Sequence, residues 1–222
     1  MNAKVKFFRN IVANLVLIVV LGVTIFFVTS MGSPAVSVLE PVSRGESGES
    51  VSIMVKVNAT SSREHVESML SIFSQHEVRT TFFVSGVWAG EHMELLQKMH
   101  ADGHEIGNLG FFNKDHKSLG AERTREEIEL THRLVKNAIG VEMTLFTPPA
   151  GNFSPQTLAV AEELGYITVV GLRSTDSLSD VIPGDLITLY PTNTNVTALT
   201  QILTTIRQAN LRITTVSDLI AH

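Results

Sequence analysis

The sequence predicts an α/β domain with a mainly parallel sheet or barrel, preceded by one apolar segment near the N-terminus. Two patterns indicate this class. From Val51 onward, short apolar runs of strand length alternate with longer segments whose apolar residues recur at helical spacing. This alternation is typical of βαβ units, in which the strands are parallel and helices cover the sheet. In such a domain, functional side chains gather at the carboxyl ends of the strands.

The predicted strands are short runs rich in apolar, β-branched and aromatic residues, and in chain order they cover residues 51–57, 80–84, 105–108, 144–146, 167–170, 186–189 and 213–216. The predicted helices cover residues 61–75, 91–101, 122–139, 155–164 and 196–209. Ser61 with Glu64 resembles a capping box that opens the first helix. Gly140 ends the longest helix, and Ser154 before Pro155 is a typical helix start.

A membrane anchor is predicted at the N-terminus. Three basic side chains lie within the first nine residues, the next charged residue is Glu40, and residues 11–28 are apolar at all but three positions. Eighteen helical residues span about 27 Å, close to the thickness of the hydrocarbon core. Because Lys and Arg remain on the cytoplasmic side, we expect residues 1–10 in the cytoplasm, a single-pass anchor in the cell membrane over 11–30, and the remainder outside.

Residues 31–50 are rich in Ser, Gly, Pro and Glu without periodicity, which is typical of a flexible linker. The exported domain is therefore expected over 51–222. An alternative to the uncleaved anchor is a signal peptide, because Ser33-Pro34-Ala35 could serve as a small-residue cleavage site.

Composition excludes several classes of protein. Without the three basic residues at the N-terminus, 14 basic side chains oppose 22 acidic ones, so the exported part has a net charge of −8. Such an acidic domain does not favour nucleic-acid binding, which usually needs a basic face. The absence of cysteine excludes disulfides, thiolate zinc sites and cysteine nucleophiles.

Several strings along the exported domain resemble the polysaccharide deacetylases, the NodB homology domain of carbohydrate esterase family four. They are Thr81–Gly86, Gly103–Asn108, Thr147–Phe153, Glu163–Tyr166, Gly184–Ile187 and Thr215–Leu219. The resemblance implies a distorted (β/α) barrel with fewer regular units than a standard one. It also implies removal of acetyl groups from chitin, peptidoglycan or xylan. In that reaction a divalent metal, usually zinc, is held by an Asp and two His, with a carboxylate base and a histidine acid.

The first two family motifs have lost the residue types that this chemistry needs. Asn58 stands at the position of the catalytic base, and Ala59 stands at the position of the metal-binding Asp. Leu109 and Asn113 replace the two metal-binding histidines of the second motif. Ala and Leu cannot coordinate a metal, and a lone Asn amide is a poor zinc ligand.

The remaining motifs are substituted as well. Thr147 replaces the arginine that orients the base, although the Pro148–Gly151 turn is kept. Ser174 stands where the family has an aspartate, with Asp176 close by, and Tyr190 replaces the acid histidine. The resemblance therefore implies a non-catalytic member, for which no cofactor is expected. Zinc or another divalent metal is expected only if a residual deacetylase activity exists.

Binding is the function that such a domain could keep. The residues expected around the opening at the carboxyl ends of the strands are Asn58, Asn108, Asn113, Thr147, Pro149, Ala150, Gly151, Ser174 and Tyr190. Neutral amides and hydroxyls suit hydrogen bonds to sugar hydroxyls and acetamido groups. The alternative interpretation is that they merely fill and solvate a vestigial pocket.

Three functions remain open. The first is a catalytically inactive, membrane-anchored domain that binds cell-wall glycan or an envelope protein. The second is a residual or altered deacetylase that uses Asp176, His116 or Tyr190. The third is a structural protein of envelope or spore assembly. Outside the motifs, we expect His116 and His132 at the surface, His104 in a structural role and Trp88 in the core.

Overall fold

The computed structural model describes residues 14–24, 39–46, 48–171 and 181–221. It divides into two compact units, residues 1–38 and 39–222. In the first unit, residues 14–24 are helical, with exposed apolar side chains such as Leu17 and Ile18. No helix among the described residues is both long and apolar enough to cross a membrane. The predicted anchor over 11–30 extends beyond the described residues on both sides and stays a prediction.

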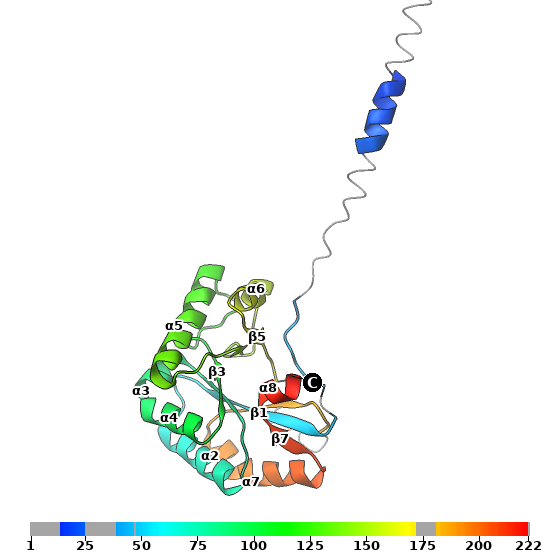
Figure 1. The fold of residues 1–222 in the computed structure, drawn as a ribbon. Helices are drawn as coiled ribbons and strands as arrows, with labels where there is room; N and C mark the ends of the chain where they lie inside the picture. The colour runs from blue at the N-terminus through cyan, green and yellow to red at the C-terminus, as the bar shows by residue number, and fades with distance from the viewer. Residues whose placement is uncertain (1–13, 25–38, 47, 172–180, 222) are drawn as a thin grey trace, which may run out of the picture. The chain divides into compact units, whose positions relative to one another are not determined.

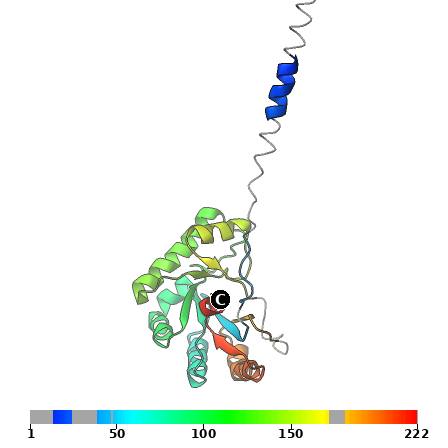
Figure 2. The ribbon, with the colours of Figure 1, turned by 45° about the vertical axis from the view of Figure 1, so that its right-hand side comes forward.

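The second unit is built on parallel strands, which confirms the predicted α/β class. The described strands are β1 (Ser50–Val57), β2 (Thr81–Val84), β3 (Glu105–Asn108), β4 (Leu145–Phe146), β5 (Ile167–Thr168), β6 (Leu186–Leu189) and β7 (Arg212–Thr214). Their spatial order is β5-β4-β3-β2-β1-β6, and β7 pairs with the first residues of β1. The sheet forms a half-barrel, seen from two sides in Figures 1 and 2.

Helices connect the strands and follow the amphipathic segments of the sequence. They are α2 (Arg63–Gln75), α3 (Gly86–Glu91), α4 (Met93–Ala101), α5 (Ala121–Ile139), α6 (Pro155–Glu163), α7 (Asn193–Gln208) and α8 (Val216–Ile220). Helices α2 and α7 lie side by side (Figure 1). The sequence did not predict α3 or α8. Both are short and capped locally: Ser85 accepts a hydrogen bond from the Trp88 N–H, and Thr215 accepts one from the Asp218 N–H.

The two predicted helix starts have different outcomes. The Ser154 cap is confirmed, because its side chain and that of Thr157 form a reciprocal capping box. The Ser61 cap is wrong, since α2 begins at Arg63 and its N-cap residue makes no side-chain hydrogen bond. The Ser61 hydroxyl instead accepts a hydrogen bond from the Asn58 N–H at 3.0 Å, within the turn that follows β1.

Alternate side chains of the strands face two apolar cores, as the pleat of a strand requires. The outer core lies between the sheet and the helices and includes Ile53, Val55 and Phe82. The inner core lies on the opposite face, and its buried members are Met54, Phe83, Leu109, Leu145, Val169, Leu186, Val216 and Leu219.

Helix α8 covers the amino end of this inner face (Figure 2). The Val216 N–H donates to Thr81 Oγ1 at 2.8 Å, and the Ser217 N–H donates to Glu105 Oε2 at 3.2 Å. Thr81 and Glu105 are the first residues of β2 and β3. Helix α8 therefore fills the amino end of the inner face, so a site on this face has to be sought at the carboxyl end.

The segment before β1 belongs to the domain. Val42 pairs with Val169 beyond β5, and Arg44 pairs with Asp185 before β6. An ion pair of 2.8 Å between Arg44 and Asp185 strengthens the second bridge. This segment links the two edges of the half-barrel, so the expected domain boundary at residue 51 is too late. The composition of residues 31–50 is polar and gives no sign that part of this segment pairs with both edges of the sheet.

Candidate functional site

Beyond the inner core, the carboxyl end of the half-barrel carries polar side chains. Lys56 lies two residues beyond Met54, Thr147 two beyond Leu145, and Tyr190 four beyond Leu186, so all three continue the inner face. We call this end, with Lys56, Thr147 and Tyr190, the mouth. The half-buried Tyr190 is partly open to solvent, and burial raises the pKa of its hydroxyl.

The first motif forms a closed turn at the mouth. Asn58 Oδ1 accepts hydrogen bonds from the Thr60 N–H at 2.9 Å and from the Thr60 hydroxyl at 2.8 Å. This Asx turn occupies the side-chain oxygen that a sugar would otherwise use. Ala59 beside it is half-buried. Asn58, which stands at the family's catalytic-base position, therefore fixes the conformation of this turn.

The second motif is held by hydrogen bonds to a carboxylate. Leu109 is completely buried within the inner core, whereas Asn113 is exposed on a left-handed backbone with a φ of 57°. Glu127 of α5 accepts hydrogen bonds from the Phe111 and Phe112 N–H groups, each at 2.7 Å. Glu127 was not predicted as a functional residue, although an acidic side chain on the buried face of an amphipathic helix is a visible signal.

Asn108 does not line the mouth. Its amide donates to the Ile128 carbonyl at 2.9 Å and to the Tyr166 hydroxyl at 3.2 Å, and its oxygen accepts from the Gly110 N–H. The side chain is completely buried on the outer face, so its expected role in sugar binding is wrong in this structure. His132 also bonds to Tyr166, and its half-buried side chain contacts the exposed Glu142 at the surface.

The third motif meets β1 through a residue that the sequence analysis gave no role. Lys56 Nζ donates to the Pro148 carbonyl at 3.0 Å, and the Gly151 N–H donates to the same oxygen. Lys56 is only 3% exposed, and burial lowers its pKa to about 8. Thr147 is completely buried and its hydroxyl has no hydrogen-bond partner. The only charged side chain of β1 was the available signal.

The other expected positions in this turn differ in exposure. Pro149 is buried, Ala150 is exposed, and Gly151 is half-buried with a φ of 73°, a conformation that favours glycine. Ser174 and Asp176 lie outside the described residues, so their roles stay predictions.

His116 is buried, which corrects its expected place at the surface. Its ring packs against Phe146 at a centroid distance of 5.2 Å, and neither nitrogen has a hydrogen-bond partner. The loop after β3 folds back, so that His116 Nε2 lies 3.0 Å from where a Cβ on Gly110 would stand. Burial lowers the His116 pKa to about 4.

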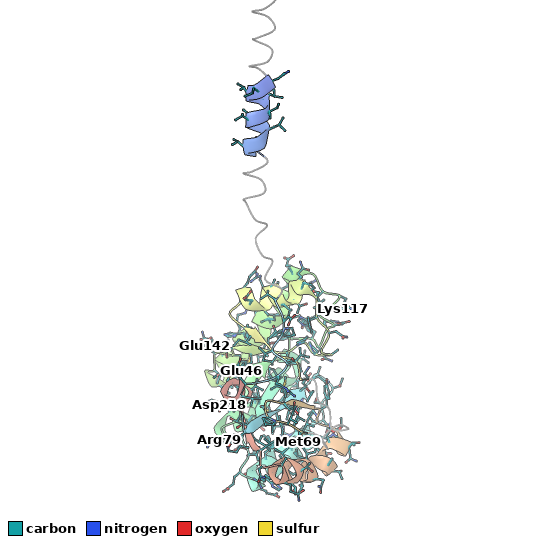
Figure 3. The ribbon with its side chains drawn as sticks, turned by 90° about the vertical axis from the view of Figure 1, so that its right-hand side faces the viewer. Glu46, Met69, Arg79, Lys117, Glu142 and Asp218 are labelled. Carbon is teal, nitrogen blue, oxygen red and sulfur yellow. The ribbon has the colours of Figure 1, made fainter. Side chains whose placement is uncertain are left out.

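The predicted structural residues are confirmed. His104 is buried between Phe73 and Phe82 and accepts a hydrogen bond from the Thr80 N–H at 3.2 Å, while Trp88 is completely buried in the outer core. His104 also lines a cleft of about 640 Å³ at the amino end. Figure 3 labels two of its other lining residues, Arg79 and Asp218. This cleft lies on the side opposite the mouth.

The residues at the family's metal positions do not fit a divalent metal. Ala59 has no donor atom, Leu109 belongs to an apolar core, and Asn113 offers only an exposed amide. Among the described residues, no three His, Cys, Asp or Glu side chains come together as a metal site would need. The mouth can instead donate hydrogen bonds from one buried ammonium and from hydroxyl groups.

Comparison with known proteins identifies the fold and the relatives. The family model described as polysaccharide deacetylase matches residues 46–169, more than half of the chain. The chain is 28% identical over 193 residues to the uncharacterized protein YlxY of Bacillus subtilis, covering 81% of this chain and 60% of YlxY. It is 31% identical over 106 residues to the peptidoglycan-N-acetylmuramic acid deacetylase PdaA of B. subtilis, covering 47% of this chain and 40% of PdaA.

Solved structures share the architecture. The structure of BA3943 from Bacillus anthracis, described as a carbohydrate esterase family 4 pseudoenzyme, superposes with a TM-score of 0.76 at 22% identity. The match covers 81% of this chain and 68% of BA3943. A mutant of BA3943 is described as having restored enzymatic activity. The chain thus spans less than two thirds of YlxY and shares its fold with BA3943. This chain belongs to the polysaccharide deacetylase family and is related to deacetylases of peptidoglycan and chitin.

Proposed function

We propose that this chain is a non-catalytic polysaccharide deacetylase-like domain that is anchored in the cell membrane and binds cell-wall glycan or an envelope protein outside it. The proposal rests on which residues stand at the family's metal-binding positions. Leu109 lies within the inner core, and Ala59 and Asn113 cannot complete a set of metal ligands. Without a metal, neither activation of water nor polarisation of the acetyl carbonyl is available to the family mechanism.

Two further observations support a binding role. The mouth contains buried hydrogen-bond donors, and the Pro148–Gly151 turn is held in place by Lys56 rather than lost. BA3943, a protein with this fold, is described as a pseudoenzyme. The apolar residues 11–28 support the single-pass anchor with the N-terminus in the cytoplasm.

An acetate-release assay tests the absence of catalysis. The full chain is incubated with peptidoglycan and with acetylated chitooligosaccharide in the presence of zinc, cobalt or nickel. We expect no acetate above that of an empty-vector preparation. Metal-dependent release above this control would contradict the proposal and favour the residual deacetylase.

A matched variant tests whether restoring the family's residue types at the metal positions restores zinc binding. Asn58→Asp, Ala59→Asp, Leu109→His and Asn113→His together restore the family's residue types at the first two motifs. We expect this variant, but not the natural chain, to retain one equivalent of zinc by elemental analysis. Equal zinc retention by both chains would show that other residues bind the metal. Co-sedimentation with peptidoglycan then separates a glycan-binding role, for which the chain pellets, from a purely structural one.

A further inference from the structure

Lys56 places a positive charge inside the half-barrel. Its side chain is 3% exposed and lies on the inner face of β1, directly beyond the inner-core residue Met54. Nζ donates to the Pro148 carbonyl at 3.0 Å. An ammonium group has three N–H donors, so two of them have no partner among the described residues.

This charge also has no counter-ion in the part of the chain that the structure describes. No Asp or Glu oxygen there lies within 4.0 Å of Nζ. Lysine is almost never buried without a partner, because removing a charge from water is costly unless an opposite charge and hydrogen bonds compensate. A buried cation that is kept at such a cost indicates an anion that binds beside it.

The surroundings of Lys56 offer further donors. The Thr147 hydroxyl, next to Pro148, and the Thr188 hydroxyl of β6 are both buried without a partner. Val55 and Leu189, the residues directly before Lys56 and Tyr190, pair across β1 and β6. Tyr190 is only half-buried, so this part of the mouth is in contact with solvent.

We propose that the mouth binds a carboxylate, whose oxygens accept hydrogen bonds from the Lys56 ammonium and from the Thr147 and Tyr190 hydroxyls. A planar carboxylate presents two oxygens with about four acceptor positions, which suits one ammonium and two hydroxyl donors. The inference rests on the proposed function, because it takes the mouth to bind a ligand rather than a catalytic metal. The carboxylate could be free in solution or could belong to a glycan, as in N-acetylmuramic acid.

Calorimetric titration of the full chain tests this site with three probes: acetate, N-acetylmuramic acid and N-acetylglucosamine. The two sugars differ by the lactyl carboxylate of the first. We expect acetate and N-acetylmuramic acid to bind and Lys56→Met to weaken both at least tenfold, while N-acetylglucosamine shows no saturable binding. Binding of N-acetylmuramic acid at least tenfold tighter than acetate would identify a glycan carboxylate, and equal affinities would identify a free one.

Two outcomes would overturn the inference: no saturable binding of acetate or N-acetylmuramic acid, or equal affinities in the natural chain and Lys56→Met. If Lys56→Met does not fold, the variants Thr147→Val and Tyr190→Phe test the site instead. Each removes one proposed donor and is expected to weaken acetate binding several-fold. If neither carboxylate probe binds but the chain still co-sediments with peptidoglycan, only the carboxylate site is overturned. Metal-dependent acetate release overturns the proposed function instead.

Discussion

The two ends of the half-barrel treat their buried polar groups differently. At the amino end, the Thr81 hydroxyl accepts from the Val216 N–H and donates to Glu105, which also accepts from the Ser217 N–H. At the mouth, Lys56 faces no carboxylate among the described residues, and the Thr147 hydroxyl has no partner. An unsatisfied buried polar group costs about 1–3 kcal/mol. The contacts of Thr81 and Glu105 therefore stabilise the fold, whereas Lys56 and Thr147 keep donors available at the expense of stability.

Two buried histidines, one near each end, give the largest expected effect. Burial lowers the pKa of both His104 and His116 to about 4, below the 6.5 of an unfolded chain. The unfolded state then binds more protons between these values, so stability is complete above pH 6.5 and is lost as the pH falls towards 4. Each histidine contributes up to about 3 kcal/mol to this loss. Urea unfolding at pH 7 and pH 4.5 measures it, and His116→Phe should remove its share.

At pH 7 the same two positions should behave differently. His104→Phe leaves the buried Thr80 N–H without its acceptor, and we expect a loss of about 1–3 kcal/mol. His116 has no partner to lose, so His116→Phe should be neutral or slightly stabilising. Equal destabilisation by both variants would show that His116 is also satisfied and would remove the contrast.

Lys56→Met should stabilise the chain. The folded pKa of about 8 lies below the ordinary 10.5, so the buried charge lowers stability below pH 8 and is relieved as the pH rises towards 10.5. We expect Lys56→Met to be about 1–3 kcal/mol more stable than the natural chain at pH 7, with a smaller difference at pH 10. Urea unfolding at both pH values measures this. A less stable variant at pH 7 would show that the ammonium is compensated.

Thr81→Val tests the amino end with a nearly isosteric change. It removes the acceptor of the Val216 N–H and one donor to Glu105. The expected loss in the free energy of unfolding is about 2 kcal/mol. Thermal unfolding at pH 7 is the measurement, and an unchanged midpoint would show that α8 does not depend on this contact.

Thr147→Val is the matched change at the mouth and carries the smallest expected effect. Its hydroxyl is buried without a partner, so valine should be neutral or stabilising by up to about 1 kcal/mol. The same thermal unfolding experiment applies. A loss as large as that of Thr81→Val would mean that the Thr147 hydroxyl is bonded in the folded protein.

The fold was more predictable from the sequence than the site. Strand-length apolar runs and family strings located the strands of the half-barrel, because burial on both faces leaves a strong pattern. Asn108 was misplaced because a motif does not state which face of a strand its residues take. Its neighbour Leu109 faces the inner core, and the pleat then turns Asn108 outward. His116 lies on a loop without periodicity, so its burial follows from a path that no local pattern determines.

Lys56 was missed for a different physical reason. At Asn58 and Ala59 the residue types that the family motif requires are absent, and this loss is visible in the sequence. A gained charge carries no such signal, although its place between Val55 and Val57 within a buried strand was visible. The structure shows that Lys56, rather than Asn58 or Ala59, places a charge inside the mouth.

The pKa of the Lys56 ammonium is the most direct test of an uncompensated charge in the mouth. The full chain, labelled with ¹³C-lysine, is titrated by NMR, and Lys56→Met identifies the resonance. We expect a pKa near 8, with an increase when acetate is added. A pKa at or above the ordinary 10.5 without any added anion would contradict a buried, unpaired cation.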